Sequence, residues 1–358
     1  MTDLLRPSPF IDLAAVEAWD AWFRWREQAD LRDFSIEDTW RRVATALASV
    51  EAGGEIATWR MRFTDAFAAW RLLPDECLLA DAGTGRTECR NGTLHASVNA
   101  AAFVSAGQAA GATIDLVALG DCAALAVRAL DNAALLAGIA SPCLRIGMLG
   151  VADALALLDL RYDSEPGRAQ AAAMAKALAE GCLRGNIALA AERGVCGCGA
   201  GASLARAGRR VLPEELLRDA ARRGVRHAQL TAITSQPRLA LLANNVADAV
   251  DPLWGMDHAH VIAASDGHRT LRSSGYALNI LHAWGREPGA APTPARPSWM
   301  AQIAMRAALQ PWMDEPIDYP LLATDPLDDS QRLEARKLAA TYGLGEPAWR
   351  DEVAPQPL

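Results

Sequence analysis

Residues 114–136 read IDLVALGDCAALAVRALDNAALL, and residues 145–160 read RIGMLGVADALALLDL. Both runs are apolar, rich in alanine and leucine, and long enough for helices, so each predicts a mostly buried helix. The first is expected to end near Gly138, because glycine readily adopts the backbone conformation that follows a helix. A third helix is expected to open at Ser164 and to close at Gly194. The middle of the chain is therefore expected to be helix-rich.

A small sheet is expected beside these helices. Thr93–Val104 has the pattern of a strand, Gln229–Thr234 alternates like one, and His260–Ala264 is a further candidate. Leu72–Gly85 predicts a short strand that runs into a glycine turn. Such a turn can approach a phosphate, but without a following lysine and hydroxyl residue it is not a P-loop. The sequence therefore predicts an α/β fold that is predominantly helical.

We expect an N-terminal helical region, residues 1–75, and a larger core, residues 76–350. The first region holds three tryptophans at helical spacing (Trp19, Trp22 and Trp25), a capped helix behind Ser35 and a further amphipathic helix before Pro74. Two interruptions are expected within the core and a flexible tail after it: a glycine-rich break at 195–208, a connector rich in proline and alanine at 287–297, and a tail at 351–358.

Composition restricts the classes of function. The 358 residues are 51% hydrophobic and 22% charged, which excludes disorder as the main state. The net charge of −8 argues against nucleic-acid binding, which usually needs a basic face. Ala133–Leu144, the most apolar uncharged run, is too short to cross a bilayer, and the N-terminal residues lack the apolar core of a signal peptide. With seven scattered cysteines, these features predict a cytoplasmic protein.

Several segments in order resemble the large subunit of ribonucleotide reductase, and they are most similar to its adenosylcobalamin-dependent type (class II). The segments that carry the resemblance are EDTWRRVA (37–44), LLP (72–74), ADAGT (80–84), AVRALDN (126–132), RIG…GVADAL (145–155), GVRHA (224–228), LLANNV (241–246), DPLW (251–254) and AALQPWMD (307–314). They extend over most of residues 35–350, so the resemblance implies an α/β barrel protein of that family.

The family's catalytic centre has no counterpart in this sequence. In that family a thiyl radical on a loop-tip cysteine, within an Asn-x-Cys-x-Glu type motif, abstracts a ribose hydrogen, and two further cysteines supply the electrons. This chain passes from the strand at 98–104 almost directly into the helix at Ile114, so the loop tip and its motif are absent. Asn99 and Ala100 stand where the family has asparagine and cysteine, and alanine forms neither a thiolate nor a disulfide. The resemblance therefore implies a shortened, degenerate paralogue: a remnant of the barrel with a small residual sheet instead of a closed ten-stranded barrel.

The substrate-phosphate turn of the family also appears in altered form. The turn aligns with six residues: Ser235, Gln236, Pro237, Arg238, Leu239 and Ala240. Family turns of this type bind phosphate through backbone N–H groups and small hydroxyls. Pro237 removes one N–H group and Leu239 presents a hydrocarbon side chain, although Arg238 could still attract an anion. We therefore expect a degenerate turn.

A metal site is a separate hypothesis. Cys196 and Cys198 form a C-x-C pair in the glycine-rich break, and such a pair can supply two of the four ligands of a structural zinc. The candidates for the remaining ligands are Cys77, Cys89, His95, His258 and His260. The alternative is that Cys196 and Cys198 are surface thiols. The other cysteines, Cys122, Cys143 and Cys182, lie in apolar helical contexts and are expected in the core.

Three functions remain open from the sequence. The first is a catalytically inactive, reductase-like scaffold that acts by binding, with no cofactor expected. The second is an active adenosylcobalamin-dependent reductase that needs a partner chain, and the third is a metal-binding or redox-sensing module built on Cys196 and Cys198. A homodimer or a protein partner, with weak nucleotide binding, fits the first function. Its docking face would be the stripe of Trp299, Ile303 and Leu309 or that of the N-terminal tryptophans.

Overall fold

The computed structural model describes residues 9–28, 30–86, 92–107, 111–196, 212–253, 258–264, 267–286, 298–323 and 327–351. The helices within these ranges are α1 (Leu13–Trp22), α2 (Ile36–Ala48), α3 (Ile56–Ala68), α4 (Glu76–Asp81), α5 (Leu116–Leu136), α6 (Val151–Leu157), α7 (Glu165–Arg193), α9 (Glu214–Arg223), α10 (Pro237–Leu242), α11 (Tyr276–Ala283), α12 (Trp299–Leu309) and α13 (Asp329–Thr341). The strands are β1 (Arg26–Glu27), β2 (Asp30–Leu31), β3 (Leu72–Pro74), β4 (Thr93–Asn99), β5 (Val104–Ser105), β6 (Thr113–Ile114), β7 (Cys143–Leu149), β8 (His258–Ala264), β9 (Gly267–Ser273), β10 (Leu321–Ala323) and β11 (Trp349–Asp351). Short 3-10 helices are η1 (Ala100–Phe103) and η2 (Gln310–Trp312).

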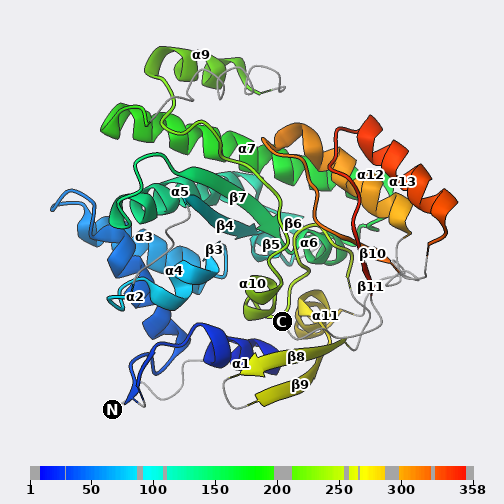
Figure 1. Ribbon diagram of the computed structural model, residues 1–358, viewed down its shortest axis with the longest axis horizontal. Helices are drawn as coiled ribbons and strands as arrows, with labels where there is room; N and C mark the ends of the chain where they lie inside the picture. Colours follow the sequence, from blue (N-terminus) through cyan, green and yellow to red (C-terminus); the bar gives the residue numbers. More distant parts are fainter. Residues whose placement is uncertain are drawn as a thin grey trace.

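A three-stranded sheet of β3, β4 and β7 lies at the centre of the molecule (Figure 1). β4 and β7 run parallel, and the helix α5 connects them because parallel neighbours need a crossover. β3 pairs antiparallel with β4. The expected strand at 229–234 is reduced to one parallel bridge, between Thr231 and Ile146 of β7. The sheet thus holds two long parallel strands, β4 and β7, and one short antiparallel strand, β3.

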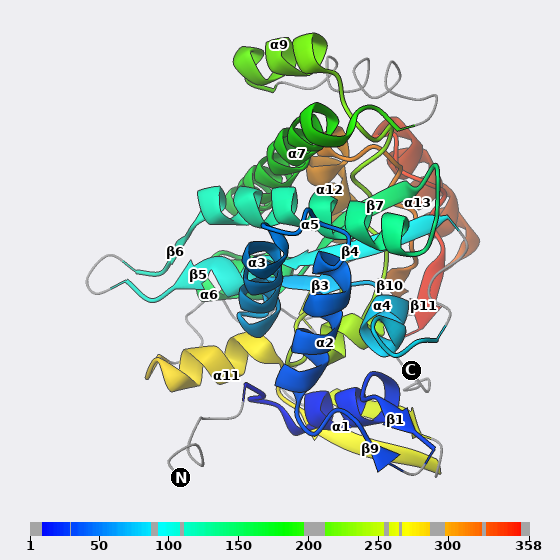
Figure 2. The same cartoon turned by 90° about the vertical axis from the view of Figure 1, so that its left-hand side faces the viewer.

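Helices cover the sheet on both sides. In Figure 1, α5 and α7 lie above the sheet, while α10 and α11 lie below it. Figure 2 shows α2 and α3 in front of the same sheet. The α2–α3 hairpin and α5 share one apolar core, to which Phe63, Leu130 and Met174 belong. The N-terminal helices therefore form one wall of the core.

The expected helix at 145–160 is wrong in its first half. Residues 143–149 form β7, and only 151–157 are helical. A parallel strand buried on both faces reads as a continuous apolar run, which cannot be distinguished from a buried helix by its periodicity. Gly150 separates the two elements with a φ of 66°, a conformation that glycine adopts without strain. The strand expected after Leu72 is also too long, because Asp75 caps the helix α4 directly behind β3.

The helices α5 and α7 pack unusually closely, because small residues meet at their contact. A Cβ atom on Gly181 would lie 2.0 Å from the carbonyl oxygen of Gly120, and one on Gly185 would lie 2.7 Å from that of Ala124. Glycine at these positions lets the two backbones touch. The α7 helix otherwise follows its sequence prediction, with Ser164 as its N-cap and Gly194 at its end.

The fold class expected from the sequence is confirmed. Apart from the central sheet, the described strands form separate two-stranded sheets, and the described residues form no closed barrel. About half of the described chain is helical, as befits a remnant of a larger barrel. Among the described helices, none combines the length and the apolar character needed to span a bilayer. The connector at 287–297 lies outside the described residues, as do most of the break at 195–208 and the tail at 351–358.

Candidate functional site

The carboxyl ends of β4 and β7 meet at one edge of the sheet, and the predicted redox position, Asn99 and Ala100, lies there. Asn99 ends β4, and its Oδ1 accepts a hydrogen bond of 3.2 Å from the backbone of Ala101. A Cβ atom on Gly150, directly after β7, would lie only 2.5 Å from that same oxygen. Asn99 and Ala100 are each 0% exposed. The predicted redox position is therefore a methyl group packed inside the core.

The segment Ser235–Ala240, where a degenerate phosphate turn was expected, binds a carboxylate of its own chain. The backbone N–H of Gln236 donates to Oδ1 of Asp248 at 2.7 Å, and the Ser235 hydroxyl lies 2.5 Å from Oδ2 of the same side chain. Leu239 and Ala240 are buried in α10. Two donors of this turn, the Ser235 hydroxyl and the Gln236 N–H, are thus occupied by Asp248.

Arg238, the remaining cation of the turn, also has partners within the chain. Its guanidinium lies 3.6 Å from Glu76 and 5.1 Å from the ring centre of Trp22. Burial raises the pKa of Glu76, and the nearby Arg238 opposes this rise. Arg238 is therefore drawn toward α4 and α1.

The buried carboxylate of Asp153 forms further hydrogen bonds near this edge of the sheet. Asp153 of α6 accepts backbone hydrogen bonds from Ala247, at 2.6 Å, and from Ala277, at 3.0 Å. Burial raises the pKa of Asp153 to about 6, although both hydrogen bonds favour its charged form. The side chain ties α6 to the segment after α10 and to α11. Its hydrogen bonds therefore stabilise the fold.

A second polar cluster surrounds Asp131 at the end of α5. Its carboxylate contacts Arg226 and Arg193, each at 2.5 Å, and the Nε2 atom of His227 at 2.9 Å. Burial alone would raise the pKa of Asp131, but the hydrogen bonds from His227, Arg226 and Arg193 outweigh it and hold this pKa well below its usual range. Asn132 beside it donates to the carbonyl of Leu47. These contacts join α5, α7, α2 and the segment at 225–227.

The proposed zinc ligands do not come together among the residues that the structure describes. Cys196 lies after α7 with its Sγ 2.9 Å from the carbonyl oxygen of Ala140, while Cys198 and Cys89 lie outside the described residues. Cys77 is disulfide-bonded, which the scattered spacing of the cysteines did not predict. No group of three His, Cys, Asp or Glu side chains in the described part of the chain could hold a metal ion. Cys122 and Cys182 are buried as expected, and Cys143 is half-buried on β7.

The two aromatic stripes considered as docking faces both pack into the protein. Trp299, Ile303 and Leu309 are buried, and Trp19 is 6% exposed. Trp22 and Trp25 are half-buried, and Trp22 donates its indole N–H to the carbonyl of Ala263. Trp19, Trp299, Ile303 and Leu309 therefore belong to the core, and Trp22 packs against it.

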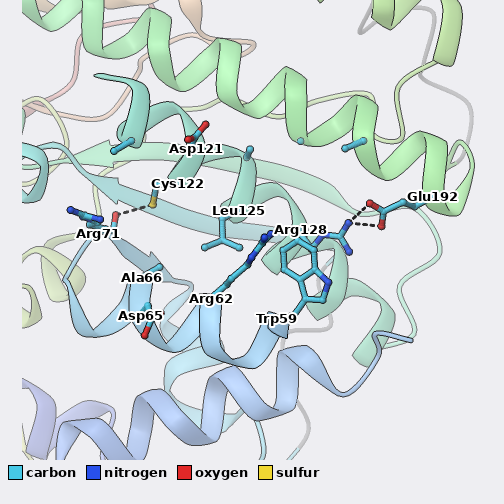
Figure 3. Close-up of a pocket in the computed structure, with 14 residues that line it drawn as sticks. Trp59, Arg62, Asp65, Ala66, Arg71, Asp121, Cys122, Leu125, Arg128 and Glu192 are labelled. Carbon is cyan, nitrogen blue, oxygen red and sulfur yellow. Dashed lines mark hydrogen bonds and ion pairs between the residues drawn. The ribbon is translucent and has the colours of Figure 1, made fainter. Parts of the chain in front are cut away.

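A cavity of about 790 Å³ lies outside the sheet, between α3, α5 and α7 (Figure 3), and we call it the α3–α5 groove. Its lining residues are Trp59, Arg62, Asp65, Ala66, Arg71, Ala118, Asp121, Cys122, Ala124, Leu125, Arg128, Gly185, Ala188 and Glu192. The sequence predicted only an amphipathic helix before Pro74 in this region. The sequence could not show that Arg62 and Arg128 lie near the ring of Trp59, because their helices, α3 and α5, are distant in the sequence.

The charges of the groove are unevenly paired. Arg128 lies within ion-pair distance of Glu51 and Glu192, and Asp121 within ion-pair distance of Arg184. Arg62 forms no ion pair with any acidic side chain of the described residues, and its guanidinium lies 4.7 Å from the ring centre of Trp59. Cys122 at the back of the groove is inert, because burial raises the pKa of its thiol to about 12. The groove can therefore bind but offers no nucleophile there.

The comparison with protein families agrees with the resemblance seen in the sequence. Residues 93–256 match the model of the ribonucleotide reductase barrel domain. This segment runs from β4 to the residues before β8, so it includes α5, β7, α7 and the turn at Ser235–Ala240. None of the curated proteins compared with the chain matches it. The chain is thus similar to the large subunit of ribonucleotide reductase over this segment.

Proposed function

We propose that this ribonucleotide-reductase-like chain is a degenerate paralogue of the adenosylcobalamin-dependent type, and that it acts by binding without reducing ribonucleotides. The observation that carries the proposal is the closed carboxyl edge of the sheet. Ala100 is packed where the family places a redox cysteine, and Asp248 is bonded to the turn that would hold a substrate phosphate. Ala100 removes a redox thiol, and Asp248 removes hydrogen-bond donors for a phosphate. Both residues are nevertheless compatible with the fold.

The residues at this edge do not fit the chemistry of adenosylcobalamin in that family, which passes a radical to a cysteine. Asn99, Ala100 and Gly150 stand at the ends of the two parallel strands. The described cysteines lie elsewhere: Cys122 and Cys182 in α5 and α7, Cys143 at the start of β7, Cys196 behind α7 and Cys77 in a disulfide. No described thiol is therefore placed to carry the radical at this edge.

The proposal is tested by assaying the full chain with adenosylcobalamin, a dithiol and ribonucleoside di- and triphosphates. We expect no deoxyribonucleotide above a control without protein. Formation of deoxyribonucleotide by the isolated chain would overturn the proposal. Formation only after addition of a second chain would instead support an active reductase that needs a partner.

The Ala100→Cys variant sharpens this test. It restores one redox cysteine but not the radical cysteine, so we expect it to remain inactive. Its melting temperature reports whether the buried site accepts the larger side chain. Ribonucleotide reduction by Ala100→Cys would show that the chain retains the radical machinery, and would contradict the proposal.

A further inference from the structure

The α3–α5 groove has the form of a small-molecule site. Trp59, Arg62 and Ala66 come from α3, Cys122 and Leu125 from α5, and Gly185 and Ala188 from α7. Leu125 and Ala66 lie between the charged groups in Figure 3, and Ala118, Ala124 and Ala188 add to the apolar lining. A volume of about 790 Å³ lies in the range of ~300–1,000 Å³ that ligand pockets occupy.

Two guanidinium groups lie over the same indole ring but differ in their partners. Arg128, 3.9 Å from the ring centre of Trp59, has a side chain only 7% exposed and is neutralised by Glu51 and Glu192. Arg62 lies 4.7 Å from that centre, is exposed, and has no acidic partner among the described side chains. The indole of Trp59 positions Arg62 by a cation–π contact. The N–H groups of the Arg62 guanidinium remain available for hydrogen bonds to a ligand.

The acidic groups nearest to Arg62 do not replace such a partner. Glu192 is bound to Arg128, and Asp121 to Arg184. Asp65, on the next turn of α3, points its carboxylate away from α5 in Figure 3, whereas Arg62 extends toward Leu125. Arg71 is a second groove arginine without an ion pair among the described residues, and its guanidinium lies 5.2 Å from the ring centre of Phe103.

We propose that the α3–α5 groove binds a small organic anion, whose carboxylate, phosphate or sulfonate is held by Arg62 while its apolar body lies over Leu125 and Ala66. The inference rests on the proposed function, because it names the ligand class of a protein that acts by binding. Guanidinium groups form charge-assisted hydrogen bonds to such anions, and an apolar floor favours a ligand with a hydrocarbon body. Arg71 adds positive potential at the other end of the groove.

The test compares two probes of similar shape, the sulfonate 8-anilinonaphthalene-1-sulfonate and the uncharged N-phenyl-1-naphthylamine, by titration calorimetry on the full chain. We expect the sulfonate to bind at least about tenfold more tightly, which is the effect of one charge-assisted hydrogen bond of ordinary strength. Arg62→Gln should remove about that factor for the sulfonate and leave the uncharged probe unchanged. Arg60→Gln, an exposed arginine of the same helix outside the groove, should change neither affinity by more than about twofold.

Two further substitutions test the sign and the place of binding. Asp65→Asn should raise the affinity for the sulfonate, because it removes a negative charge that lies about one helical turn from Arg62. Ala188→Phe fills the groove from α7 and should weaken both probes, whereas Ala191→Phe, exposed on α7 outside the groove, should weaken neither.

Several outcomes would overturn the inference. They are equal affinities for the two probes, equal losses in Arg60→Gln and Arg62→Gln, or binding that Ala188→Phe leaves intact. These outcomes are separable from a failure of the proposed function. A chain that binds no sulfonate and reduces no ribonucleotide loses only this inference, whereas one that reduces ribonucleotides loses the proposed function whatever its groove binds.

Discussion

The carboxyl edge of the sheet and the α3–α5 groove are both rich in polar groups, but only one of them is open. At the edge, Asp248 bonds to the turn at Ser235–Gln236, and Asp153 bonds to the backbones of Ala247 and Ala277. In the groove, Arg62 faces a cavity of about 790 Å³ without an acidic partner among the described side chains. Polar groups at the edge therefore stabilise the fold, whereas the guanidinium of Arg62 in the groove remains available to a ligand.

The same contrast holds between the groove and the Asp131 cluster next to it. Arg128 belongs to both regions, since it lines the groove and pairs with Glu51, which in turn pairs with Arg193 of the cluster. A buried charge is tolerated only when partners replace its lost hydration. Removal of a charged partner should thus lower the free energy of unfolding strongly at the edge and in the Asp131 cluster. Removal of the Arg62 charge in the groove should change it only slightly.

The largest effect is expected for Asp131→Ala. The change leaves Arg226 and Arg193 without their shared carboxylate inside the protein, so we expect the free energy of unfolding to fall by about 3–5 kcal/mol. The matched control is Asp121→Ala on the same helix, whose exposed pair with Arg184 should contribute about 1 kcal/mol or less. Urea denaturation measures both. Similar losses for the two variants would contradict the distinction between closed and open regions.

The pKa of Asp131 adds a pH dependence to this prediction. Because its pKa in the folded protein lies well below the ordinary value of 3.8, the stability that it contributes is present above that value and is lost as the pH falls through the folded pKa. Wild type should therefore lose stability in strong acid more steeply than Asp131→Ala.

A second prediction concerns Asp153 and has the opposite sign. Its folded pKa of about 6 lies above the ordinary 3.8, so its contribution to stability is fully present below 3.8 and is lost as the pH rises through about 6. The shift corresponds to about 3 kcal/mol at most. The unfolding free energy of wild type minus that of Asp153→Asn should thus increase as the pH falls from about 8 to about 5. A difference that is constant with pH would show that Asp153 does not titrate in this range.

A smaller effect is expected for Asp248→Ala at the edge. The backbone N–H of Gln236 and the hydroxyl of Ser235 lose their acceptor, so we expect a loss of about 1–2 kcal/mol. The two donors should then be free to donate hydrogen bonds to an anion. Pyrophosphate should therefore raise the melting temperature of the variant but not that of wild type. If pyrophosphate stabilises wild type equally, the turn is not closed by Asp248.

Much of this contrast could be predicted from the sequence wherever the signal is local. The bounds of α5 and α7 follow from apolar spacing, from the Ser164 cap and from Gly194. The strand expected at Thr93–Val104 is confirmed for Thr93–Asn99, but Ala100 lies in the 3-10 helix that follows it and not within the strand. The fold class followed from the same patterns together with the missing central segment.

The rest depended on contacts between distant segments. Residues 143–149 have the composition of a buried helix, and only pairing with β4 makes them a strand. Asp248 lies 13 residues beyond Ser235, with nothing in its own segment to suggest that it closes the turn. The position of Arg62 next to a cavity requires α3, α5 and α7 to assemble first. Sequence patterns therefore predicted elements, but not which polar groups would find partners.

The smallest effect, and the most direct test of the contrast, is expected for Arg62→Gln in the absence of any ligand. Arg62 and Arg128 lie over the same ring of Trp59, yet only Arg128 is buried and paired. Arg62→Gln loses an exposed cation–π contact and no ion pair, so the free energy of unfolding should change by less than about 1 kcal/mol. Arg128→Gln leaves Glu51 and Glu192 without one partner and should cost about 2–3 kcal/mol more. Chemical denaturation of the two variants measures this difference. If both substitutions lower the free energy of unfolding equally, Arg62 is a structural residue like Arg128. Its guanidinium is then not available to bind a ligand.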